Sequence, residues 1–143
     1  MIKFEKVPAD ILSRIPEATR ILLEDDNVVF AYLFGGLASG TVRSLSDVDI
    51  AVYVKDVDHL AEYKMRLFDK LTDILGTDEL DLVVLNTAPT SIAGRILLNK
   101  QVLVDKEPFR RHIYESVTAR EFFDFKIRED AYFARRYGLC GTI

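Results

Sequence analysis

The sequence predicts a single α/β domain in which a small central β-sheet is flanked by helices. Apolar runs of strand length alternate with segments whose apolar residues recur every three or four positions, the spacing of an amphipathic helix. The chain has 143 residues, 49% of them hydrophobic, which is enough for one ordinary core. No internal repeat or low-complexity linker divides it. We expect one domain over residues 1–143, with a core at about 10–105 and a C-terminal helix at about 107–137.

The first half of the chain is expected to form a helix and two strands. Apolar spacing predicts a helix over 10–24. We expect Pro16 to mark the first turn of its main part, because proline is tolerated there and not further inside a helix. Uninterrupted apolar runs predict strands at 28–34 and 50–54. Such runs are typical of central strands that are covered on both faces.

The second half continues the alternation of helices and strands. We expect a helix at 59–75, a strand at 80–85, a short helix from Thr90 or Ser91 to Leu98, a strand at 101–104 and a long helix at 107–137. Gly76 ends the first of these helices. Pro108 stands in the first turn of the last helix, and Gly138 follows its end.

The long C-terminal helix has more apolar surface than one packed face requires. Two apolar stripes are expected on it: Ile113, Val117, Ala131 and Ala134 in one, and Phe122, Phe125, Tyr132 and Phe133 in the other. Two explanations fit. Either one stripe packs on the domain and the other meets a partner, or a small domain wraps the helix deeply.

The residues that carry chemistry lie between the first two strands. Gly35 and Gly36 are followed by ten residues and then by Asp47, Val48 and Asp49. Residues two apart in a strand point to the same face, so the two carboxylates stand side by side. Mg²⁺ takes one or two carboxylates and leaves room for substrate phosphates. The glycines let the backbone approach a phosphate, and a short helix after them would present free N–H groups.

The same residues have a purely structural explanation, in which the glycines form a turn and the aspartates cap a strand. The combined spacing between two apolar strands favours the magnesium and phosphate site. Asp81 is a third candidate, because it stands within an otherwise apolar strand. A buried carboxylate is costly unless it is paired or bound to a metal. The alternative for Asp81 is a charge on an edge strand.

This pattern resembles the minimal nucleotidyltransferase (MNT) group of the polymerase-beta-like superfamily, whose motif is a Gly-Ser pair, ten residues and Asp-x-Asp. The resemblance implies a polymerase-beta-like fold with a small mixed sheet. It also implies that Asp47, Asp49 and Asp81 are the catalytic residues and the ligands of two Mg²⁺ ions, with ATP as the nucleotide substrate.

The resemblance further assigns residues to the phosphates. Gly35, Gly36 and Ser46 would line them, and Arg43 is a candidate phosphate contact with a solvated loop arginine as the alternative. Two positions depart from the family pattern. Gly36 stands where serine is usual, and Ser39 stands where arginine is common.

For function, the resemblance implies an antitoxin of a HEPN/MNT pair that transfers AMP from ATP to a tyrosine of the partner HEPN ribonuclease toxin. One alternative is a small-molecule nucleotidyltransferase of the aminoglycoside type, although such enzymes usually carry an additional domain. The other is a catalytically weak module that neutralises its partner by binding, which the two departures from the motif suggest.

Charge and composition argue against a nucleic-acid-binding, membrane or secreted protein. The net charge is −4, so no overall basic field attracts nucleic acid, and no direct nucleic-acid binding is expected. No apolar run approaches the roughly 18 residues of a membrane span, and the first ten residues lack the features of a signal peptide. A single cysteine, Cys140, agrees with a reducing compartment. We expect a cytoplasmic protein without membrane contact.

Overall fold

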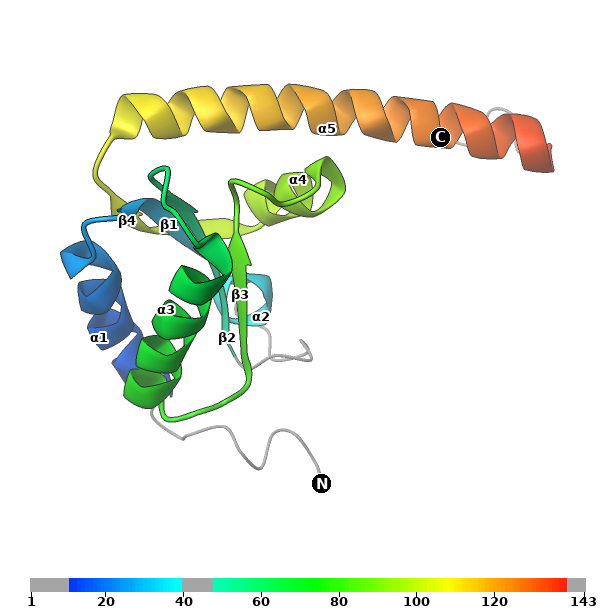
Figure 1. Ribbon diagram of the computed structural model, residues 1–143. Coiled ribbons are helices and arrows are strands. Elements are labelled where there is room, and N and C mark those ends of the chain that lie inside the picture. The colour runs from blue at the N-terminus through cyan, green and yellow to red at the C-terminus, as the bar shows by residue number, and fades with distance from the viewer. Residues whose placement is uncertain (1–10, 40–47, 139–143) are drawn as a thin grey trace.

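The computed structural model describes residues 11–39 and 48–138 and shows a four-stranded sheet with helices on both faces (Figure 1). The elements in chain order are α1 (Ile11–Glu24), β1 (Val28–Phe34), α2 (Gly35–Ser39), β2 (Val48–Val54), α3 (Leu60–Leu75), β3 (Leu80–Val84), α4 (Thr90–Leu98), β4 (Lys100–Asp105) and α5 (Pro108–Tyr137). The predicted α/β class and the order of its elements are confirmed.

The strands lie in the order β3-β2-β1-β4. β1 is antiparallel to both β2 and β4, whereas β2 and β3 are parallel. The sheet is therefore mixed, as the resemblance implied. The two strands with uninterrupted apolar sequence, β1 and β2, occupy the centre, because only central strands can bury side chains on both faces.

The two faces of the sheet have separate apolar clusters. On one face, α1 and α3 contribute Ala18, Leu22, Leu67 and Leu71 to the larger cluster. The other face holds a smaller cluster, which includes Phe30, Tyr32 and Ala51 from the strands and Ala93 and Ile96 from α4. Alternation along β2 places Val48, Ile50 and Val52 in the larger cluster. Asp49 therefore points to the α4 face, together with Ala51.

Several details differ from the sequence prediction, most of them by one or two residues at the end of an element. β2 begins at Val48 rather than at residue 50, because Asp49 pairs with a residue of both neighbouring strands. β4 is longer by one residue at each end than the predicted 101–104. Pro16 lies inside α1, not at the start of a helix. Ile11 is buried with Ala18 on one apolar face that continues past the proline, so packing offsets the lost backbone hydrogen bond.

The helix α5 crosses above α4 and continues beyond the rest of the fold (Figure 1). The inward face buries Thr118 and Phe122, and the Phe122 ring occupies the space where a side chain at Gly94 of α4 would stand. In one of the two expected stripes, Ile113 and Val117 are 48% and 43% exposed, whereas Phe122 of the other stripe is buried. The alternative of a deeply wrapped helix is wrong, because only Thr118 and Phe122 of α5 are buried.

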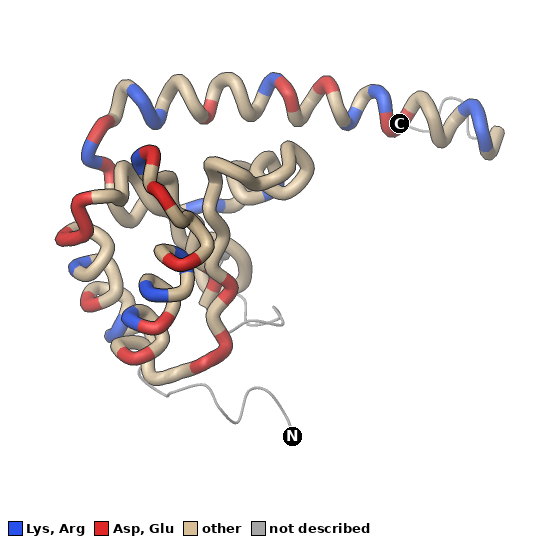
Figure 2. The backbone as a smooth tube through the Cα atoms, viewed as in Figure 1, with Lys and Arg blue, Asp and Glu red and all other residues tan. Residues whose placement is uncertain are grey.

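Charges of both signs are interspersed along α5 (Figure 2). Several are paired within the helix or at its start, as in Lys126 with Glu129 and Arg110 with Glu107. In the part of the chain that the structure describes, no helix has the length and apolar character needed to cross a membrane.

Candidate active site

The register of β2 and β3 brings two of the predicted carboxylates together. Asp49 pairs with Asp81 across the parallel ladder. Neighbouring strands lie about 4.8 Å apart, and paired residues point to the same face. The two side chains therefore stand beside each other on the face that α4 covers. The sequence predicted both residues, but their pairing depends on strand order.

Gly35 turns the chain directly against Asp49. Phe34, the last residue of β1, pairs with Asp49, and Gly35 follows with φ of +74°, a value that favours glycine. A Cβ at Gly35 would overlap the carboxylate oxygen Oδ2 of Asp49. The glycine is therefore required both by the backbone conformation and by the close approach of the carboxylate. Gly36 is buried behind it in α2.

Asn99 supports this turn, and the sequence analysis missed it. Its side-chain Nδ2 donates to the carbonyl oxygen of Gly35 at 3.4 Å. Asn99 lies between α4 and β4, 64 residues from Gly35 in the chain. No local signal in the sequence could have connected the two positions.

The two carboxylates differ in how far they are exposed. Asp81 was expected to be buried, but it is exposed, because β3 is an edge strand and its outer side meets solvent. Asp49 is only 4% exposed, because β2 lies between two strands and Gly35 packs on its carboxylate. A buried and an exposed carboxylate thus share one site, and Asp81 also lies in a surface groove along β3.

The donor set fits a hard cation in part. Within residues 11–39 and 48–138, no group of three or more His, Cys, Asp or Glu side chains is placed to hold a metal ion. Asp49 and Asp81 supply two carboxylates in register, which matches the one or two that Mg²⁺ uses. Arg43, Ser46 and Asp47 lie outside the described residues. Their assignments remain predictions.

The same face of the sheet carries a third carboxylate, Glu115 of α5, in different surroundings. It accepts a hydrogen bond from the Tyr32 hydroxyl at 2.6 Å and pairs with Arg111 at 3.0 Å and with Lys100 at 3.5 Å. Burial raises the pKa of Glu115, but the bonds from Tyr32 and Arg111 outweigh it, and the net pKa is lowered. This carboxylate anchors α5 to the sheet.

Comparison with known proteins agrees with the fold. Residues 17–109, more than half of the chain, match the family model described as Polymerase beta, Nucleotidyltransferase. The chain therefore belongs to the polymerase beta nucleotidyltransferase family.

One curated protein is similar to this chain over part of its length. Protein adenylyltransferase MntA of Shewanella oneidensis is 33% identical over 90 residues, which cover 60% of this chain and 63% of that protein. The match thus spans just under two thirds of the length of this curated relative.

Two solved structures share the fold over a larger part of the chain. A chain in a crystal structure of the toxin-antitoxin with AMP-PNP is 25% identical, with a TM-score of 0.69 over 85% of this chain and 98% of that one. A chain in the complex of tri-AMPylated Shewanella oneidensis HEPN toxin with MNT antitoxin is 22% identical. Its TM-score is 0.66 over 87% of this chain and 98% of that one.

Proposed function

We propose that the protein is a magnesium-dependent nucleotidyltransferase that transfers AMP from ATP to a tyrosine of a HEPN toxin and acts as its antitoxin. The observation that carries the proposal is the pair of carboxylates, Asp49 and Asp81, in register beside the turn at Gly35. Membership of the nucleotidyltransferase family and the similarity to protein adenylyltransferase MntA support the reaction. The similar structures of toxin-antitoxin complexes support the partner.

The reaction is a single displacement at phosphorus. The acceptor hydroxyl oxygen forms a bond to the α-phosphorus of ATP, and the bond from that phosphorus to the oxygen bridging to the β-phosphate breaks. Pyrophosphate leaves, and the hydroxyl proton passes to a base. We assign the base role to Asp81, because its exposed carboxylate is open to an incoming acceptor. Positioning and charge neutralisation supply most of the catalysis in such transfers.

The remaining residues are assigned to ATP and the cation. Gly35 and Gly36 present backbone to the triphosphate, with Ser46 and Arg43 as further phosphate contacts predicted by the sequence. Asp49 and Asp81, with Asp47, would hold Mg²⁺, which neutralises charge on the phosphates and favours the ionised acceptor when it is bound.

The test is a mass measurement on both proteins. The purified protein is incubated with Mg²⁺, ATP and the HEPN protein encoded beside it, and the intact mass of each chain is determined. We expect the HEPN protein to gain one or more AMP units, and peptide mapping to locate them on tyrosine. Asp49→Asn should abolish the gain. Asp78→Asn, at an exposed position just before β3, removes the same charge and should preserve it.

Two results would contradict the proposal. A stable complex without any mass change would identify a module that neutralises its partner by binding. Transfer of AMP to an aminoglycoside but not to the HEPN protein would identify a small-molecule enzyme. Omission of Mg²⁺ tests the cation separately. AMP transfer that persists in excess chelator would contradict the magnesium requirement but not the rest of the proposal.

A further inference from the structure

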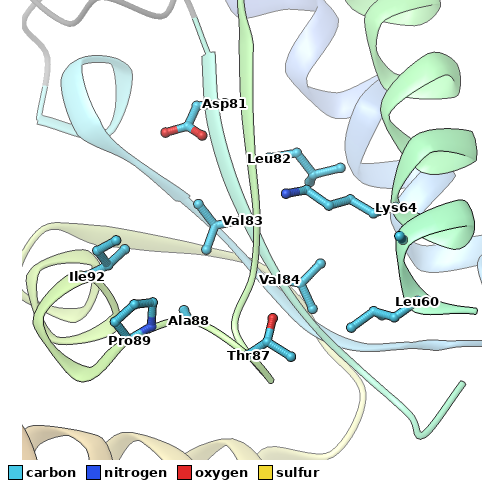
Figure 3. A pocket seen from close by; sticks show the side chains of 11 residues that line it. Leu60, Lys64, Asp81, Leu82, Val83, Val84, Thr87, Ala88, Pro89 and Ile92 are labelled. Atoms are coloured by element: carbon cyan, nitrogen blue, oxygen red, sulfur yellow. The ribbon is translucent and has the colours of Figure 1, made fainter.

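A surface groove of about 540 Å³ follows the outer edge of β3 and begins at Asp81 (Figure 3). Its floor is the strand itself, residues 81–84. One wall comes from α3, with Leu60 and Lys64, and the opposite wall comes from the start of α4, with Pro89 and Ile92. The groove therefore straddles the edge of the sheet, with one wall on each face.

Two backbone N–H groups along this floor point away from the sheet, although the carbonyl of Val84 already accepts a hydrogen bond from the Thr87 N–H at 3.3 Å. The Leu85 N–H, just beyond β3, donates to the Val52 carbonyl of β2 at 2.8 Å, so this backbone group points into the sheet. Backbone groups of successive residues in a strand point in opposite directions, so the N–H groups of Leu82 and Val84 point to the outer edge. In the described part of the chain, no strand pairs with β3 on this side. A strand edge of this kind is a template for an added strand.

We propose that this groove binds an extended segment of the acceptor protein as an additional strand on β3, and that this pairing delivers the acceptor hydroxyl to the site. The inference rests on the proposed function and adds how its protein substrate is held. Backbone N–H groups at strand spacing, between two walls, are the features that recognise an extended peptide. Among the described residues, Lys64 is the single basic residue that lines the groove, and one positive charge is poor complementarity for the phosphates of a nucleic acid.

The proposal predicts a pattern in the bound segment. Side chains of an added strand would alternate between the α3 wall and the α4 wall. Asp81 and Val83 point to the α4 side, and Figure 3 shows the Asp81 carboxylate on the side of the strand that carries Ile92 and Pro89. The acceptor residue must therefore point to this side. Two positions away, an apolar side chain would meet Val83 and Ile92.

A matched pair of variants on α4 tests the groove. Ile92 is 47% exposed in the groove wall, and Leu98 is 66% exposed on the same helix but outside the groove. With the HEPN protein as acceptor, Ile92→Glu should slow AMP incorporation by about tenfold, the effect of losing a central interface contact. Leu98→Glu should stay within about twofold of wild type. Binding of AMP-PNP with Mg²⁺, measured by calorimetry, should be the same in both variants.

The possible outcomes distinguish a failure of the groove proposal from a failure of the proposed function. If the wild-type protein is active and the two variants incorporate AMP at equal rates, the proposed role of the groove is wrong and the proposed function is unaffected. If the wild-type protein transferred no AMP to the HEPN protein, the proposed function would be wrong. The role proposed for the groove, which rests on that function, would then be wrong as well. Slower transfer accompanied by weaker AMP-PNP binding in Ile92→Glu would assign the defect to the nucleotide and also overturn the groove.

Amide hydrogen exchange tests the backbone pairing directly. In the free protein the N–H groups of Leu82 and Val84 should exchange faster than that of Val83, which points into the sheet. On mixing with the HEPN protein and AMP-PNP, Leu82 and Val84 should become protected, and Val83 should change little. Unchanged exchange at Leu82 and Val84 in the complex would exclude strand addition. Protection of both groups already in the free protein would exclude it as well.

Discussion

Carboxylates on one face of the sheet have different surroundings in two parts of the molecule. Above β1 and β4, Glu115 is surrounded by a hydroxyl donor and two cations, and its pKa is lowered. Above β2 and β3, Asp49 and Asp81 stand in register with each other. Like charges directly opposite in neighbouring strands destabilise a sheet. The first arrangement places one carboxylate among groups that donate to it, whereas the second places two carboxylates beside each other.

The surroundings of Asp49 differ from those of Glu115 in a second way. The chain places a glycine with positive φ against the more buried carboxylate, where any side chain would collide with it. These features support the proposal that the β2–β3 side binds a cation and the phosphates of a nucleotide. The α5 side is organised to hold the helix.

The largest expected effect is at Asp49. Asp49→Asn should reduce AMP transfer roughly 1000-fold, about 4 kcal/mol, because a ligand of the phosphate-binding cation is lost. The variant should remain folded in urea unfolding, because asparagine has nearly the same shape as aspartate, so the loss of transfer should not come from unfolding. Rates come from intact mass and stabilities from urea unfolding. A variant that is both active and unstable would reverse the roles assigned to the two sides.

The next largest effect is expected on stability at Gly35, and Gly138 serves as its control. Gly35 and Gly138 both have positive φ, +74° and +69°, but only Gly35 has neighbours where a Cβ would stand. Gly138→Ala should cost about 1 kcal/mol of unfolding free energy through the backbone alone. Gly35→Ala should cost about 3 kcal/mol, because Asp49 must also move. Equal costs in urea unfolding would show that the contact with Asp49 has no energetic weight.

Packing between α4 and α5 should respond less strongly. A methyl group at Gly94 would overlap the ring of Phe122, so Gly94→Ala should lower the free energy of unfolding by about 2 kcal/mol. Adding Phe122→Leu to Gly94→Ala should recover part of that loss, because the smaller side chain can give way to the methyl group. The four proteins of this double-mutant cycle are compared by urea unfolding. Strict additivity would contradict the contact.

The smallest effect is at Glu115 and depends on pH. A lowered carboxyl pKa stabilises the fold above the unfolded-state value of 4.5, and this contribution is lost as pH falls through the folded-state pKa. At pH 7, Glu115→Gln should therefore lower the free energy of unfolding by about 1 kcal/mol. Below about pH 4 the difference from wild type should shrink. A difference that stays constant from pH 7 to pH 3 would show that the ionised carboxylate is not the stabilising form.

The sequence analysis predicted the helices, the strands and the carboxylates better than their surroundings. It found β1 with the correct bounds, and Gly35, Asp49 and Asp81, which it assigned to the site, lie together in the structure. It left open whether the domain wraps α5 deeply, and it erred on Pro16 and on the burial of Asp81. Each error concerns a residue whose environment is set by elements far away in the chain. The contact between Asn99 and Gly35 was missed for the same reason.

By itself, the sequence determined the α/β alternation and the Gly-Gly to Asp-x-Asp spacing. These features depend on neighbours in the chain, because helical and strand periodicity and glycine placement are local properties. The tertiary structure alone decided that β3 lies parallel to β2 with Asp81 opposite Asp49, and that the outer edge of β3 forms the floor of a groove. Strand order and register arise from packing between distant segments, and only packing decides which carboxylate is buried and which remains exposed to solvent.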